Sequence, residues 1–132
     1  MSTIAGIPGH AGFQDGQGNK ALFCGTWGLA AAHDGSRLYC CEYEGNRVRQ
    51  IDLRDGKHTV GTVLGNGLQA NRDGPAGTCS VNRPVLVVAV GADLIVSCYS
   101  GRVCKYAAKT GKFRFRFCVV ALSVLSLACL RV

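Results

Sequence analysis

The sequence has little proline and little charge, and these two shortages narrow the class of protein. Only 3 of its 132 residues are proline and 17% are charged, whereas 48% are apolar. An intrinsically disordered chain lacks this apolar content, and collagen needs far more proline. Because 18 glycines accompany so few prolines, we expect an all-β protein with many tight turns rather than a helical bundle.

Acidic residues are scarce after residue 60, where two acids accompany nine Lys and Arg residues. Six of these basic residues lie within residues 102–116, which contain no acid. Such a run could meet phosphate or an anionic surface. Neither an aromatic stacking platform nor a nucleic-acid motif accompanies it. We therefore interpret it as a solvated strand edge, and nucleic acid is disfavoured as a partner.

The sequence also lacks the features that would give its eight cysteines a disulfide or metal role. No CxxC motif occurs, and the adjacent Cys40 and Cys41 would point to opposite faces of a strand. The first residues have neither the basic nor the apolar region of a signal peptide. We therefore expect reduced, buried thiols and favour the cytoplasm over secretion, with membrane association as the alternative.

The C-terminal apolar run is too short for a membrane-spanning helix. Residues 117–130 comprise fourteen uncharged residues with basic residues on both sides, whereas a span needs about twenty apolar residues. Three interpretations stay open. The run is a truncated or misread gene end, a tail that contacts an anionic membrane, helical or not, or a cleaved lipid-anchor signal.

Comparison of the chain with itself reveals a repeat of about 57 residues. Residues 3–6 (TIAG) recur as residues 62–65 (TVLG), and the DG pair at 15–16 recurs at 73–74. The LY pair at 38–39 corresponds to LI at 94–95, and the RV pair at 47–48 corresponds to RV at 102–103. The separation falls from 59 to 55 residues along the chain. Two similar supersecondary units are therefore expected.

Regular turn signals divide the first copy into short β-rich runs. The spacing predicts antiparallel strands near residues 27–32, 37–41, 47–52 and 57–64. In the second copy, the apolar runs at 85–90 and 94–96 suit strands that are covered on both faces. A repeated four-stranded meander is the unit of a β-propeller, and two such blades cannot close a ring. We expect an incomplete β-propeller, with a first blade at 1–65, a degenerate second blade at 66–116 and a tail at 117–132.

The chain resembles the NHL-repeat β-propeller family on the residues of its first copy. The stretch AGFQDG (11–16) is followed by an apolar strand, then by DGSRLY (34–39) and GNRVRQID (45–52). Residues 3–65 match this pattern well, and residues 66–106 match it in degraded form. In the second copy the family's asparagine is missing, and Cys104 stands where the pattern has arginine.

This resemblance implies a propeller scaffold that binds proteins, RNA or carbohydrate. A related six-bladed group includes metal-dependent lactonases and a zinc-dependent lyase. The candidate binding residues are Trp27, Arg47 and Arg49. Trp27 begins the innermost strand, where it would pack between blades or contact a partner at the mouth of the propeller. The two arginines would bind an acidic partner, or pair weakly with Asp and Glu of the adjoining strand.

No pattern in the sequence predicts catalysis, a metal site or a cofactor. The GQGNKA stretch at 16–21 fits a dinucleotide loop in spacing only, because no strand and helix flank it. The carboxylates Glu42, Glu44, Asp52 and Asp55 follow no known calcium loop. They are read as surface and turn-stabilising residues. Cys40 lies in an apolar strand, where a thiol is more often inert.

Together these observations favour a non-catalytic NHL-type propeller scaffold that binds a protein, as a fragment of a longer protein. One alternative is a fragment of a propeller-fold hydrolase or lyase, which would gather ligands at the ring axis. The other is an adaptor held at a membrane by residues 117–130. In each case the open faces of the two blades must be covered by self-association or by further blades.

Overall fold

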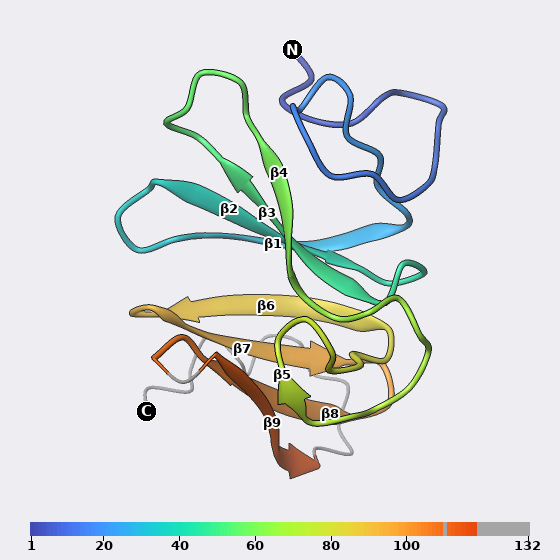
Figure 1. The fold of residues 1–132 in the computed structure, drawn as a ribbon, viewed down its shortest axis with the longest axis vertical. Helices are drawn as coiled ribbons and strands as arrows, with labels where there is room; N and C mark the ends of the chain where they lie inside the picture. Colours follow the sequence, from blue (N-terminus) through green and yellow to red (C-terminus); the bar gives the residue numbers. More distant parts are fainter. Residues whose placement is uncertain (110, 119–132) are drawn as a thin grey trace.

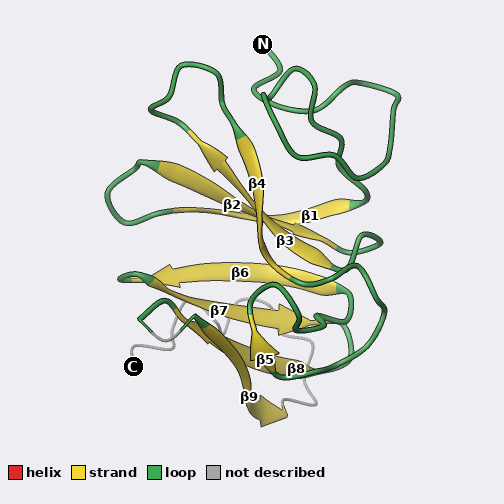
Figure 2. Ribbon diagram, viewed as in Figure 1, coloured by secondary structure: helices red, strands yellow, loops and turns green. Residues whose placement is uncertain are grey.

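The computed structural model describes residues 1–109 and 111–118, and the described residues are all-β (Figures 1 and 2). They form nine strands in two antiparallel sheets. The all-β class expected from the turn-rich composition is confirmed. The strands are β1 Thr26–Ala31, β2 Arg37–Glu42, β3 Arg47–Asp52, β4 Val60–Leu64, β5 Gly74–Pro75, β6 Pro84–Val90, β7 Asp93–Cys98, β8 Arg102–Ala107 and β9 Lys112–Cys118.

The first sheet is a meander in which β1, β2, β3 and β4 pair in sequence order. Its hairpins follow the predicted turn signals, and the turn after β1 has Gly35 at a φ of 71°. Glycine adopts this left-handed conformation without a steric cost. The predicted strand boundaries agree with β1, β2 and β3 to within a residue at each end.

The fourth strand begins later than the spacing predicts, at Val60 instead of residue 57. Asp55 accepts hydrogen bonds from the backbone N–H groups of Lys57 (2.9 Å) and Thr59 (3.1 Å), and His58 has a positive φ of 51°. The Asp55 side chain therefore extends the turn by three residues, because it satisfies amides that would otherwise enter the strand ladder.

The second sheet repeats the first as a meander of β6, β7, β8 and β9. The short strand β5 adds to the outer edge of β9 through Gly74. Gly16 takes the corresponding place in the first sheet, where it bridges Val60 at the outer edge of β4. Each meander thus receives one extra segment on its outer strand, and that segment precedes the meander in the sequence.

The positive-φ residues show that the two halves share one backbone design. Every such residue except His58 has a counterpart in the other half, and the separation falls from 59 to 55 residues as it does in the sequence repeat. Because left-handed conformations mark the same turns in both halves, the repeat found in the sequence is also a structural repeat. The pairs are Gly6 and Gly65, Gly9 and Gly67, Gly16 and Gly74, Gly25 and Arg83, Gly35 and Gly91, Asn46 and Gly101, and Gly56 and Gly111.

The two sheets pack face to face, with β6 against β1 and β2 (Figure 1). Their contact buries one core cluster that draws on both sheets, including Val48 and Leu64 from the first and Val87 and Val96 from the second. The sheets approach closely at Gly28, where an added Cβ would collide with the carbonyl oxygen of Val85. Only glycine fits this approach.

The predicted tail at 117–132 lies largely outside the described residues, since β9 ends at Cys118. Its helical, membrane and gene-end interpretations therefore stay predictions. Within residues 1–109 and 111–118, no helix is long and apolar enough to cross a membrane.

The turn at Asp55 generates a pH-dependent prediction. The hydrogen bond from the Thr59 side chain, helped by those from nearby backbone amides, lowers the pKa of Asp55 from 3.8 to about 2. A carboxyl whose pKa is lower in the folded state stabilises the fold above its unfolded pKa and loses this effect as the pH falls. We expect the urea midpoint to fall between pH 4 and pH 2, and to fall less in Asp55→Asn.

The pH titration of the Asp55 carboxyl carbon by NMR provides the direct check on this prediction. A midpoint near the ordinary value for aspartate, or equal acid losses in the wild type and the variant, would show that the turn does not hold this carboxylate.

Candidate functional site

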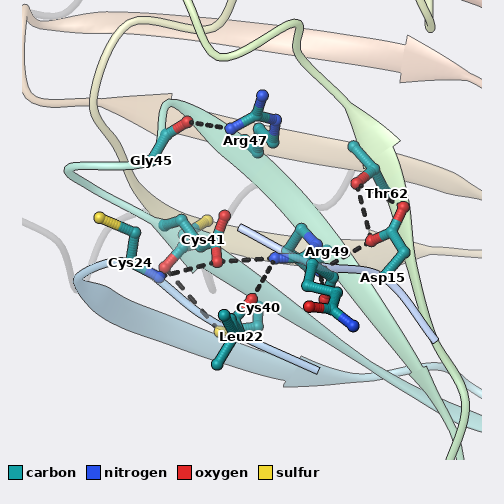
Figure 3. Close-up of polar contacts among 11 residues, drawn as sticks. Asp15, Leu22, Cys24, Cys40, Cys41, Gly45, Arg47, Arg49 and Thr62 are labelled. Atoms are coloured by element: carbon teal, nitrogen blue, oxygen red, sulfur yellow. Dashed lines mark hydrogen bonds and ion pairs between the residues drawn. The ribbon is translucent and has the colours of Figure 1, made fainter. Parts of the chain in front are cut away.

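Arg49 on β3 occupies the centre of a buried polar network between the first sheet and residues 14–22, which precede that sheet (Figure 3). Its side chain is 0% exposed. One guanidinium nitrogen donates to the carboxylate of Glu42 at 2.8 Å and to the carbonyl of Leu22 at 3.0 Å. The other donates to Asp15 at 2.7 Å and to the carbonyl of Gln14 at 3.0 Å. The arginine thus joins β3 to β2 and to residues 14–22.

Burial corrects two expectations drawn from the sequence. Arg49 has no exposed surface with which to bind a partner. Glu42, which was expected on the surface, is also buried. The expected pairing of Arg49 with an acid of the adjoining strand is confirmed, but as a buried pair. Burial raises the pKa of Glu42, while Arg49 and the amide of Cys24 oppose that rise. Such a pair tolerates the loss of neither partner, because the other charge would be left unpaired.

Arg47 lies two residues before Arg49 on β3 and is half-buried. Its guanidinium lies 3.7 Å from the centre of the Phe13 ring, a cation–π contact. It donates to the carbonyls of Gly45 at 3.3 Å and Asn66 at 3.4 Å. Arg47 therefore ties the β2–β3 turn to the loop after β4, and part of its surface stays open to solvent.

Trp27 is exposed, with 63% of its surface accessible, so it does not pack in the core between the sheets. Its ring stacks on Tyr43 at 4.9 Å and 24°, and Tyr43 meets the edge of Tyr99 at 5.5 Å and 85°. The guanidinium of Arg83 lies 5.4 Å from the centre of the Tyr43 ring. We call Trp27, Tyr43, Tyr99 and Arg83 the aromatic surface.

The repeat explains why these side chains meet. Tyr43 directly follows β2 and Tyr99 directly follows β7, so each lies at the same point of its meander. Face-to-face packing of the two sheets brings the two turns together. The Asn46 side chain fixes their relative position, because its carbonyl oxygen accepts the backbone N–H of Arg83 at 2.9 Å.

Sequence reasoning named Trp27 but missed Tyr43, Tyr99 and Arg83 as partners of that residue. A usable signal was present, since Tyr43 and Tyr99 are equivalent landmarks of the repeat. The contact between them depends on how the two sheets pack, which the repeat pattern alone does not specify.

A cavity of about 490 Å³ lies on the face of the first sheet that is turned away from the second. Its lining includes Phe23, Trp27, Leu29 and Cys40, and Leu29 is 59% exposed. The equivalent of Leu29 in the second sheet is Val87, which is 1% exposed because it packs against the first sheet. The apolar face of the first sheet around Leu29 is therefore exposed, whereas the equivalent face of the second sheet is covered by the first sheet.

The thiols of this region are poor nucleophiles, and its acids are not grouped as metal ligands. Burial, followed by the nearby Glu42 charge, raises the pKa of Cys40 to about 11, and burial also raises the pKa of Cys41. Both thiols therefore stay protonated at neutral pH and are weak nucleophiles. In the part of the chain that the structure describes, no three His, Cys, Asp or Glu side chains are grouped to hold a metal ion. The arrangement is suited to binding through aromatic and cationic groups.

Comparison with known proteins gives a likeness in fold. No known family model matches the chain, and no curated protein matches it. A crystal structure of a protein of unknown function from Bacteroides thetaiotaomicron is similar over 85% of this chain, with a TM-score of 0.69 and 23% sequence identity. This likeness shows the fold alone. The chain spans 26% of the length of that protein.

The buried network predicts that substitution of Arg49 lowers the stability strongly and that a second substitution, at Glu42, restores part of it. Arg49→Met leaves Glu42 as an unpaired buried charge, so we expect the free energy of unfolding to fall by about 3–5 kcal/mol. Adding Glu42→Leu removes that charge and should recover part of the loss. Urea denaturation of the wild type, both single variants and the double variant measures the coupling. Additive losses would contradict a direct ion pair.

Proposed function

We propose that this chain is a non-catalytic binding module of the NHL-like β-propeller type, with a protein as its partner. Two observations on the fold support the propeller. Each sheet contains a four-stranded meander, and the first strands of the two meanders, β1 and β6, lie against each other. In a propeller, neighbouring blades pack face to face with their first strands nearest the axis.

The aromatic surface is the observation that carries the binding role. Trp27 and Tyr99 are 63% and 53% exposed, although both rings already contact Tyr43. Tryptophan, tyrosine and arginine are the residues that dominate binding energy at protein interfaces. Here the contacts between the rings and Arg83 hold them in place before any partner arrives, which reduces the entropy lost on binding.

The open face of the first sheet supports an assembly with further sheets of the same kind. Leu29 is exposed where its counterpart Val87 is covered, and the neighbouring cavity is lined mainly by apolar side chains. We propose that another four-stranded sheet packs on this face around Leu29, as the second sheet packs on the opposite face, and leaves the Trp27 ring accessible. The partner protein would then bind at the end of the assembly that displays the aromatic surface.

Tryptophan fluorescence gives a direct test of the binding role, because Trp27 is the only tryptophan. Peptides are selected from a random library on the full chain, and their binding is then followed by the Trp27 emission. We expect that emission to change on binding, and Tyr99→Ala to weaken binding by tenfold or more, as loss of an interface aromatic does.

Val90→Ser is the matched control, since Val90 is a half-exposed apolar residue at the opposite end of β6 from Arg83. It should bind the selected peptides like the wild type. Peptides that bind Tyr99→Ala as tightly as the wild type, with no change in Trp27 emission, would show that the aromatic surface is not the binding site.

A further inference from the structure

Each turn that carries a tyrosine of the aromatic surface is closed at its base by a pair of side chains on neighbouring strands. In the first sheet this pair is Glu42 on β2 and Arg49 on β3, joined at 2.8 Å. The register aligns Glu42 with Arg47, so Arg49 lies on the diagonal from Glu42. Side chains at these two positions are therefore diagonal neighbours on the same face of the sheet.

In the second sheet the equivalent positions hold two cysteines. Cys98 ends β7 directly before Tyr99, as Glu42 ends β2 directly before Tyr43. Cys104 on β8 aligns with Val96, so it lies on the same diagonal from Cys98. The ion pair of the first sheet is thus replaced by a pair of thiols.

Cys98 and Cys104 lie on neighbouring strands in the core between the sheets. Both are buried and belong to the same apolar cluster. A hydrogen bond with the Cys98 thiol, followed by burial, raises the pKa of Cys104. Both are free cysteines in this structure.

We propose that Cys98 and Cys104 form a reversible disulfide that covalently closes the turn carrying Tyr99. The oxidant is a low-molecular-weight disulfide. One cysteine thiolate attacks its S–S bond, forms a mixed disulfide and releases one thiol. The second thiolate then attacks the bound sulfur, which forms the Cys98–Cys104 bond and releases the second thiol. The two cysteines lose two electrons and two protons, and the oxidant's disulfide gains them as two thiols.

This disulfide would replace the ion pair of the first sheet by a covalent link at the same structural position. Formation needs a thiolate, so exchange in the folded chain should be slow at neutral pH and faster as the pH rises. The inference goes beyond the proposed binding function and does not depend on it, because its test uses no partner.

Tryptic mapping of the oxidised full chain tests the pairing. Trypsin cuts after Arg102 and Lys105, so Cys104 leaves in the tripeptide 103–105. That tripeptide stays attached to the peptide containing Cys98 only through a disulfide. After refolding in a mixture of oxidised and reduced glutathione, and alkylation of free thiols, we expect the linked peptide in the wild type and its loss on reduction.

Cys79→Ala is the matched control, because Cys79 lies in the same tryptic peptide and the same core cluster. Its equivalent in the first half is the buried Ala21, since Leu22 and Ser80 make equivalent β-bridges. The variant should therefore fold and keep the linked peptide, whereas Cys98→Ala should lose it. Cys104 recovered as the alkylated thiol, as a glutathione adduct only, or linked in the wild type but not in Cys79→Ala would overturn the proposal.

Discussion

The close packing of β6 on the first sheet is the contact on which the rest of the structure depends. It places Val48 and Leu64 of one sheet against Val87 and Val96 of the other, and burial of such side chains is the main favourable term in folding. Gly28 permits this approach, since a side chain there would meet the backbone of β6. A single sheet would leave one apolar face in water. The aromatic surface also depends on this contact, because Tyr43 and Tyr99 come from different sheets.

The two halves show how one backbone design carries different chemistry. The left-handed residues recur in order along both meanders, so the turns are conserved within the chain as a geometric pattern. The side chains at the base of the tyrosine turns have diverged, from Glu42 and Arg49 in one half to Cys98 and Cys104 in the other. The guanidinium of a buried ion pair needs hydrogen-bond acceptors from several segments of the chain. Two buried thiols are stable in an apolar core without such acceptors. This difference explains why the second half can depart from the first at Cys104 and still hold the same register.

Local signals in the sequence were enough to predict the strands of the first sheet, apart from the start of β4, but not the site. Turn residues repeat at short intervals and determine hairpins directly, so β1, β2 and β3 were predictable. The burial of Arg49 was not, because its partners Gln14 and Asp15 lie 35 and 34 residues away and come together only in the folded chain. Trp27 was identified as an aromatic of interest, but its stacking on Tyr43 follows from tertiary packing. The late start of β4 depended on one side chain, Asp55, whose hydrogen bonds compete with the strand ladder.

Native-state hydrogen exchange in increasing urea tests most directly whether the contact between the sheets holds the fold together. The shared core predicts that the most protected amides of β2 and β7 open together, with one free energy and one urea dependence equal to those of global unfolding. Two separate isotherms, in which one sheet exchanges fully while the other stays protected, would show that each sheet is stable alone. That result would contradict the dependence of the fold on the contact between the sheets.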